Sequence, residues 1–215
     1  MARNKYPEET VEKILTAARR LFLEKGYEKT TIQDIVDQLG GLTKGAVYHH
    51  FKSKEDIMDA ITEKMFLDGN PFEKVRGRKD LNGLEKMKEV VRLTQEPDWS
   101  SLSRQSMPLL KNPRLLAKAI EDNQTIVTPL WLELIEEGMA DGSIRTEYPR
   151  EVAELLTLLD TLWMAPTIFP ATRGNLLHKF RCVGEIFAGL GVPVIDEEML
   201  ELADRFFQLL PPELT

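Results

Sequence analysis

A chain of 215 residues with 42% hydrophobic and 29% charged side chains has the composition of a globular protein with a sizeable core, which excludes a disordered or fibrous chain. No run of about eighteen apolar residues is available for a membrane span, and the opening MARNKYPEET lacks the apolar region of a secretory signal. The single cysteine, Cys182, excludes an internal disulfide, so we expect a cytoplasmic protein with no membrane partner.

The net charge is unevenly distributed along the chain. It is −7 overall, whereas residues 1–54 hold ten Lys or Arg and seven Asp or Glu, a balance of +3. Residues 55–215 therefore carry a balance of −10. This asymmetry favours a first segment that meets a polyanion and a second segment that does not.

Two helices are predicted at the start of the chain. Apolar residues over 11–22 recur at the i, i+3, i+4 and i+7 positions of one helix face, and the KG pair at 25–26 supplies a C-terminal end. A short second helix is expected after Thr31, which has Asp34 at the capping-box position. The GG pair at 40–41 ends this second helix.

Two further helices follow at once. Thr43 can cap a third short helix, and Ser53, with Asp56 three residues later, can cap a fourth that extends to about Met65. The stretch GNPFEKVRGRKDLNG, residues 69–83, is polar and glycine-rich and indicates a connection. Beyond it we expect helices over 84–95, 101–109, 113–139 with a kink at Pro129, 149–163, 175–190 and 196–210. With no trustworthy alternating strand pattern, the predicted fold class is all-α.

The stretch LGGLTKGAVYHHFKSK, residues 39–54, concentrates lysines, a tyrosine and two of the three histidines. His49 and His50 are adjacent, so on a helix their side chains point about 100° apart and cannot share one metal ion. The segment GGLTKGA lacks the residue order of a phosphate-binding loop, and no strand precedes it. Neither a nucleophile elbow nor a carboxylate pair beside a helical histidine is present. We therefore expect no enzyme, no metal and no other cofactor.

A role in reading DNA accounts for more of these residues. Two short helices joined by a tight glycine turn are what a helix-turn-helix requires. The residues that would lead the second helix into the major groove are Thr43, Lys44, Gly45 and Ala46. Small side chains there let the backbone approach base edges, and Lys44 can reach a guanine or a phosphate. Tyr48 and His49 come one turn later, within reach of the DNA backbone, and Lys54 begins the next helix.

At these residues the sequence resembles the tetracycline-repressor (TetR) family of bacterial transcription regulators. The resemblance covers about residues 9–66 and rests on ILTAARRLFLEKGYEKTTIQDIVDQLG and TKGAVYHHFKSKEDI. It implies a three-helix DNA-binding head on a larger helical body, acting as a homodimer on a near-palindromic double-stranded operator and released by a small molecule. We accordingly expect a helix-turn-helix DNA-binding domain at 1–54 and a helical ligand-binding and dimerisation domain at 55–215.

The family pattern also implies roles for individual residues. It assigns Thr31 to helix capping and phosphate contact, with Gln33 close by. The start of the recognition helix matches Lys44, Gly45 and Ala46, the phosphate-contacting tyrosine matches Tyr48, and the histidine two residues later matches His50. The lysine that opens the next helix matches Lys54. One departure is visible, because the turn LGGLT carries one residue more than is usual, which leaves the angle of the recognition helix open.

The body carries no motif for a particular effector. We expect a pocket among its middle helices, and the candidate wall residues are Met65, Met87, Trp99, Met107, Asn123, Gln124, Trp131, Asp160, Trp163 and Met164. Methionine and tryptophan at helical spacing are also ordinary core residues. The acidic body favours a cationic or neutral effector over an anion.

Dimerisation is expected to use the last helices. The run EVAELLTLLDTLWMA, residues 151–165, is apolar on more than one face, and FRCVGEIFAGLGV, residues 180–192, places small residues where helices can approach. Cys182 is expected to be a packed thiol in this interface. The leading hypothesis is a ligand-responsive repressor. The alternatives are an activator of the same fold, or a helical ligand-binding or scaffold protein whose head binds another protein.

Overall fold

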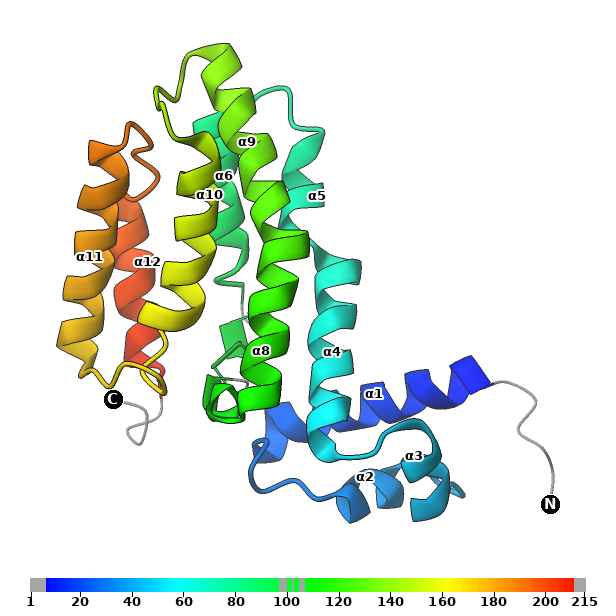
Figure 1. Ribbon diagram of the computed structural model, residues 1–215. Coiled ribbons are helices and arrows are strands. Elements are labelled where there is room, and N and C mark those ends of the chain that lie inside the picture. The colour runs from blue at the N-terminus through cyan, green and yellow to red at the C-terminus, as the bar shows by residue number, and fades with distance from the viewer. Residues whose placement is uncertain (1–6, 97–99, 102, 105–106, 211–215) are drawn as a thin grey trace. The chain divides into compact units, whose positions relative to one another are not determined.

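The computed structural model describes residues 7–96, 100–101, 103–104 and 107–210 (Figure 1). Within these ranges every regular element is a helix, which confirms the all-α prediction, and no helix is long and apolar enough to cross a membrane. Contacts divide the chain into two compact units, residues 1–70 with 101–106 (unit 1) and residues 71–100 with 107–215 (unit 2). The functional boundary expected at residue 54 stays a prediction.

Unit 1 contains the four helices that the sequence predicted. They are α1 (Pro7–Lys25), α2 (Ile32–Gln38), α3 (Lys44–His50) and α4 (Lys54–Gly69). Each predicted cap is formed, because Thr31 and Asp34 make a reciprocal capping box, Thr43 accepts from the amide of Ala46, and Ser53 accepts from a first-turn amide of α4. These caps satisfy amides that a helix start leaves without an internal partner.

The core of unit 1 is built mainly from the long helices α1 and α4. The buried side chains include Ile14, Ala18, Phe22, Ile35, Val47, Ile57 and Ile61. Full burial of an aliphatic or aromatic side chain of this size stabilises a fold by about 1.5–3 kcal/mol. Helix α3 contributes one fully buried side chain, Val47, to this core. The short helix is therefore attached along one edge and leaves its other side exposed.

Unit 2 contains the remaining described elements (Figure 1). They are α5 (Pro71–Arg76), α6 (Gly83–Leu93), the 3₁₀ helix η1 (Met107–Lys111), α8 (Pro113–Asp122), the π-helix η2 (Asn123–Val127), α9 (Thr128–Asp141), α10 (Pro149–Leu158), the π-helix η3 (Leu159–Trp163), α11 (Arg173–Gly189) and α12 (Glu197–Gln208). The helices predicted over 84–95, 149–163, 175–190 and 196–210 are confirmed to within a few residues. Of the helix predicted over 101–109, residues 102 and 105–106 lie outside the described ranges, residues 101, 103 and 104 are helical, and residues 107–109 belong to the 3₁₀ helix η1.

The prediction of a connection over 69–83 is wrong in its first half, because Pro71–Arg76 forms α5. Pro71 suits a first helical position, since its fixed φ matches the helix and its missing amide has no partner to lose there. Phe72 and Val75 are buried, and the Phe72 ring meets Trp131 of α9 edge-on, with 4.8 Å between the ring centroids. Three of the six residues of α5 have buried side chains. The packing of these side chains against unit 2 therefore stabilises a helix within a polar stretch of sequence.

The long helix predicted over 113–139 is interrupted before Pro129, where a kink was expected. A proline inside a helix donates no hydrogen bond and its ring crowds the carbonyl four residues earlier. The chain accommodates this with the π-helical turn η2, in which the amide of Thr128 bonds to the carbonyl of Asn123, five residues back. A second π-helical turn, η3, ends α10, and there the amide of Met164 bonds to the carbonyl of Leu159 at 2.8 Å.

Two close backbone approaches fix the helices of unit 2. At the start of α6, a Cβ on Gly83 would lie 2.2 Å from the amide nitrogen of Gly138 in α9 and 2.8 Å from the carbonyl oxygen of Leu134. At the turn after α11, a Cβ on Gly191 would lie 1.7 Å from the carbonyl oxygen of Arg145, whose amide bonds to the carbonyl of Gly191 at 3.1 Å. Any larger side chain at these two glycines would force backbones apart.

Candidate nucleic-acid interface

The turn between α2 and α3 depends on two consecutive glycines. Gly40 and Gly41 have φ of +46° and +112°, a region that residues with a Cβ rarely adopt. Both are exposed, and a Cβ at either would meet no atom within 4 Å. The turn therefore needs glycine for its backbone conformation and not for space. It brings Thr43 to the start of α3, where its side chain caps the helix.

The first turn of α3 presents small and basic groups to solvent. Lys44 and Gly45 are exposed and Ala46 is half-buried, so little side-chain bulk covers the backbone at this end. Tyr48 is 46% exposed, and the Lys44 ammonium lies 5.9 Å from the centroid of its ring. Val47 points the other way, into the core of unit 1. Helix α3 thus shows one exposed face suited to a nucleic-acid groove and one anchoring side chain.

The two histidines lie at the far end of the same helix. His49 is exposed and His50 is half-buried, and their rings meet edge to face with 5.2 Å between centroids. His49 therefore shares the solvent-facing side with Tyr48, whereas His50 lies closer to the body of unit 1. Both histidines were predicted to bind DNA, His49 from its position on the helix and His50 from the family resemblance, and His49 is the more exposed of the two.

Thr31 and Gln33, at the start of α2, are exposed but engaged in local hydrogen bonds. The Thr31 hydroxyl and amide both donate to Asp34 Oδ2 at 2.7 Å, and Gln33 Nε2 donates to Asp37 Oδ1 at 2.8 Å. The Lys25 ammonium lies 2.7 Å from Asp34 Oδ1. Hydrogen bonds from Lys25 and then from Thr31 hold the pKa of Asp34 well below its ordinary range. The carboxylate therefore stays ionised and keeps the cap in place well into the acidic range.

The Lys54 ammonium is hydrogen-bonded within unit 1, whereas a contact with a DNA phosphate requires an ammonium that is free to reach it. Its ammonium donates to the carbonyl oxygens of Tyr27 and Thr30 at 2.8 and 3.0 Å, and it lies 4.1 Å from the centroid of the Tyr27 ring. The side chain is half-buried and joins the start of α4 to the connection between α1 and α2. We infer that Lys54 supports DNA binding by holding the helices of unit 1 in position. Direct contact with phosphate stays a prediction.

Replacing Lys54 by methionine separates the two roles. Methionine keeps an unbranched stem but removes the hydrogen bonds to two carbonyls, and hydrogen bonds of a charged group contribute about 1.5–3 kcal/mol. We expect the melting temperature of the protein to fall, and DNA affinity to fall without a change in how it depends on salt. Thermal unfolding and DNA binding over a range of salt concentrations measure both quantities.

The matched control is Lys52→Met, which removes a neighbouring exposed lysine. It should leave the melting temperature unchanged. A different result would assign Lys54 to a phosphate contact. In that case the slope of log affinity against log salt concentration would fall by about one unit in Lys54→Met, while the melting temperature stayed unchanged.

The structure separates the ten predicted effector residues into groups. Met87 is fully buried, and Trp131 packs against Phe72, so both belong to the core of unit 2. Met107 and Met164 each pack against the hydrophobic cluster that α11 and α12 form. Met65 lies on α4, but its side chain, like all of Trp99, is outside the described part of the chain. The remaining four residues, all on the π-helical turns, are Asn123, Gln124, Asp160 and Trp163.

Threonines that the sequence analysis missed connect these π-helical turns. Asn123 Nδ2 donates to Thr161 Oγ1, and the hydroxyls of Thr128 and Thr157 lie 3.0 Å apart. Both pairs join the long helix that contains η2 to the helix that ends in η3. The signal in the sequence was the spacing of Thr157 and Thr161, which are four residues apart and therefore lie on one face of a helix rich in leucine.

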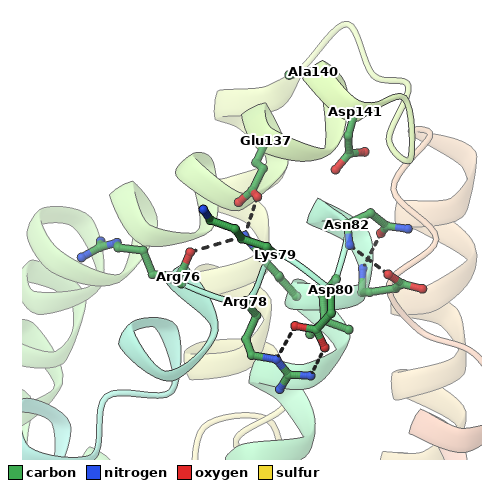
Figure 2. A pocket seen from close by; sticks show the side chains of 12 residues that line it. Arg76, Arg78, Lys79, Asp80, Asn82, Glu137, Ala140 and Asp141 are labelled. Atoms are coloured by element: carbon green, nitrogen blue, oxygen red, sulfur yellow. Dashed lines mark hydrogen bonds and ion pairs between the residues drawn. The ribbon is translucent and has the colours of Figure 1, made fainter.

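A surface groove of about 820 Å³ lies elsewhere in unit 2, between the α5–α6 connection and the end of α9 (Figure 2). Its charged groups are mostly paired. Arg78 makes two hydrogen bonds to Asp80, at 2.8 and 2.5 Å, and the buried Lys86 pairs with Glu137 and bonds to the carbonyl of Arg76 at 3.4 Å. None of the ten predicted effector residues lines it. The groove is held together by its own ion pairs.

The helices expected to dimerise carry exposed apolar groups. Leu158 on α10 is 42% exposed and Ile186 on α11 is 41% exposed. Cys182, one turn before Ile186, is also exposed in the single chain, so its packing in an interface stays a prediction. Each of the two helices thus presents one large apolar side chain to solvent in the single chain.

Comparisons with known proteins agree with the geometry of unit 1. Residues 14–61 match the family model described as bacterial regulatory proteins, tetR family. The chain is 32% identical over 158 residues to the HTH-type transcriptional repressor KstR2 of Rhodococcus jostii, covering 71% of this chain and 76% of that protein. It is 31% identical over 158 residues to the repressor AcnR of Corynebacterium glutamicum, covering 73% and 79%.

A solved structure extends the likeness to the fold of the whole chain. The crystal structure of a transcriptional regulator from Cytophaga hutchinsonii matches with a TM-score of 0.61 at 21% identity. The match covers 96% of this chain and 97% of the other.

Proposed function

Because the chain belongs to the tetR family of bacterial regulatory proteins, we propose that it represses transcription by binding a near-palindromic operator as a homodimer, and that a small molecule releases it. The observation that carries this proposal is the exposed first turn of α3. Thr43 caps the helix, Gly45 adds no side chain, and Lys44 stands free of the unit 1 core. Such an end allows the helix backbone to come close to base edges in a major groove.

The homodimer is supported by the exposed apolar side chains Leu158 on α10 and Ile186 on α11. Leu158 and Ile186 would lose their contact with water if these helices packed against the same pair in a second copy. A dimer with two-fold symmetry would place two α3 helices about 34 Å apart, one turn of DNA, or slightly farther. The operator would then consist of two inverted half-sites.

Selecting bound fragments from the source genome tests the proposal. We expect one near-palindromic site to be enriched at physiological salt, and sedimentation of the complex to give two chains per site. The variant Lys44→Glu places a negative charge at the leading end of α3, so it should weaken this binding by about tenfold to a hundredfold or more. A reporter gene with the site in its promoter should be transcribed less when the protein is present.

Two results would count against the proposal. If no genomic fragment were enriched above random DNA, the hypothesis of sequence-specific repression would be excluded. Binding that Lys44→Glu leaves unchanged would indicate that α3 does not read the DNA.

A further inference from the structure

Helix α2 is attached to the rest of unit 1 by little apolar packing. In the described part of the unit, Ile35 is the one buried side chain among the seven residues of α2. The angle between two packed helices is fixed when several side chains of each interdigitate. A single apolar contact leaves that angle open, so the orientation of α2 depends on its polar contacts.

Two polar bridges from α1 supply such contacts. Near the start of α2, the Lys25 ammonium lies 2.7 Å from Asp34 Oδ1. At the other end of the helix, the Arg20 guanidinium donates a hydrogen bond to Gln38 Oε1. Helix α2 is therefore tied to α1 at both ends.

Asp34 is the centre of the bridge near the start of α2. Its Oδ2 accepts hydrogen bonds from the amide and the hydroxyl of Thr31, both at 2.7 Å, and its own amide donates to that hydroxyl oxygen at 3.1 Å. Because Lys25 engages Oδ1, both carboxylate oxygens have partners. Thr31 gives its one hydroxyl hydrogen to this carboxylate, so in this arrangement it has none to donate to a DNA phosphate.

Neither folding stability nor attraction to DNA accounts for this carboxylate. The side chains of Lys25 and Asp34 are 42% and 30% exposed, and ion pairs this open to water contribute little to stability. A negative charge in a segment that meets a polyanion also opposes binding. What the carboxylate does provide is a fixed link between the end of α1 and the first turn of α2.

We propose that Asp34 is a positioning residue for operator binding, which fixes the orientation of α2 through Lys25 and Thr31 and so the position from which α3 enters the major groove. This inference rests on the proposed function and gives Asp34 an indirect part in it. The orientation of α2 is passed on because the glycine turn at 40–41 and the capped start of α3 follow it directly.

The variant Asp34→Asn distinguishes position from charge. It removes one negative charge per chain, so charge alone would strengthen binding to any DNA. We expect operator affinity at physiological salt to fall instead by about tenfold, the lower end of what one base contact contributes, while affinity for random DNA does not fall. Gel-shift titrations with both DNAs measure this ratio, and thermal unfolding identifies a temperature at which the variant is folded.

The conservative variant Asp34→Glu should bind the operator as the parent does. It keeps a carboxylate at the capping-box position, where glutamate is common. The ratio of operator affinity to random-DNA affinity should therefore return to the value of the parent.

Matched variants control for the change in charge. Asp37→Asn removes the neighbouring exposed carboxylate of α2, which accepts a hydrogen bond from Gln33 of the same helix, and should bind the operator at least as tightly as the parent. Lys25→Met breaks the bridge to α1 and leaves the capping box in place, so it should lower operator affinity more than random-DNA affinity. Lys13→Met removes another exposed lysine of α1 and should lower both affinities by the same factor.

Three results would overturn the proposal. They are operator affinity in Asp34→Asn equal to or above that of the parent, an equal loss of operator and random-DNA affinity in that variant, and an unchanged ratio of the two affinities in Lys25→Met. Operator selection by the parent is measured first. If the parent selects no operator, the proposed function fails and this inference with it, whereas the three results, obtained with an operator that the parent binds, remove only the role of Asp34.

Discussion

Replacing Gly45 by alanine is expected to weaken operator binding by about tenfold to a hundredfold, the equivalent of one good base contact, without destabilising the protein. A Cβ at Gly45 would meet only Thr43 Oγ1, at 3.8 Å, so the folded chain has room for it. Alanine is also favoured over glycine inside a helix by about 1 kcal/mol. The added methyl group would nevertheless stand on the exposed end of α3, where the backbone is to approach the bases. Affinity and stability should therefore change in opposite directions.

Gel-shift titration and thermal unfolding measure the two effects of Gly45→Ala. The matched control is Gly77→Ala, since Gly77 is exposed in unit 2 and a Cβ there also meets nothing within 4 Å. That variant should bind the operator as the parent does. Parent-like affinity in Gly45→Ala would show that α3 does not approach DNA by this end.

The second large effect is on stability. Gly83→Ala should destabilise the protein by about 3 kcal/mol, because its Cβ would overlap the backbone of Gly138 and Leu134. Backbone atoms cannot rotate out of the way as a side chain would, so α6 and α9 would have to separate. The residues packed nearby, among them the fully buried Met87 and Ile135, would then lose close contact. For a protein of this size the melting temperature should fall by about 6–12 °C.

Chemical and thermal unfolding measure the effect of Gly83→Ala, and Gly77→Ala again serves as the comparison because the same methyl group meets no neighbour there. Parent-like stability in Gly83→Ala would mean that the two helices can separate at little cost. The glycine contact would then not determine how they pack.

The parts of the fold that depend on nearby residues could be predicted. Thr31, Thr43 and Ser53 cap their helices with partners three residues away, and the glycines at 40–41 end α2 within one turn. The exposed end of α3 followed from the same local pattern, because Val47 is the apolar residue of a short helix otherwise made of small and polar groups. Such features are decided by a few adjacent residues.

The features that were missed depend on partners far along the chain. Lys54 bonds to carbonyls at Tyr27 and Thr30, more than twenty residues earlier, so its sequence neighbours suggested a free cation. Helix α5 forms in a polar stretch because Phe72 meets Trp131. The π-helical turns likewise require a shift of backbone hydrogen bonds that side-chain periodicity does not reveal.

The contact between Arg145 and Gly191 has a mechanical consequence for unit 2. Arg145 lies in the connection of the α9–α10 hairpin and Gly191 in that of the α11–α12 hairpin, so their hydrogen bond and backbone contact fasten the two hairpins at one end (Figure 1). The η3 end of the first hairpin is also tied to the second, because Lys179 Nζ on α11 donates to the carbonyl of Trp163 at 3.1 Å and Met164 packs on the cluster formed by α11 and α12. Attachment at both ends opposes a hinge motion between the two hairpins, so we expect them to move as one block.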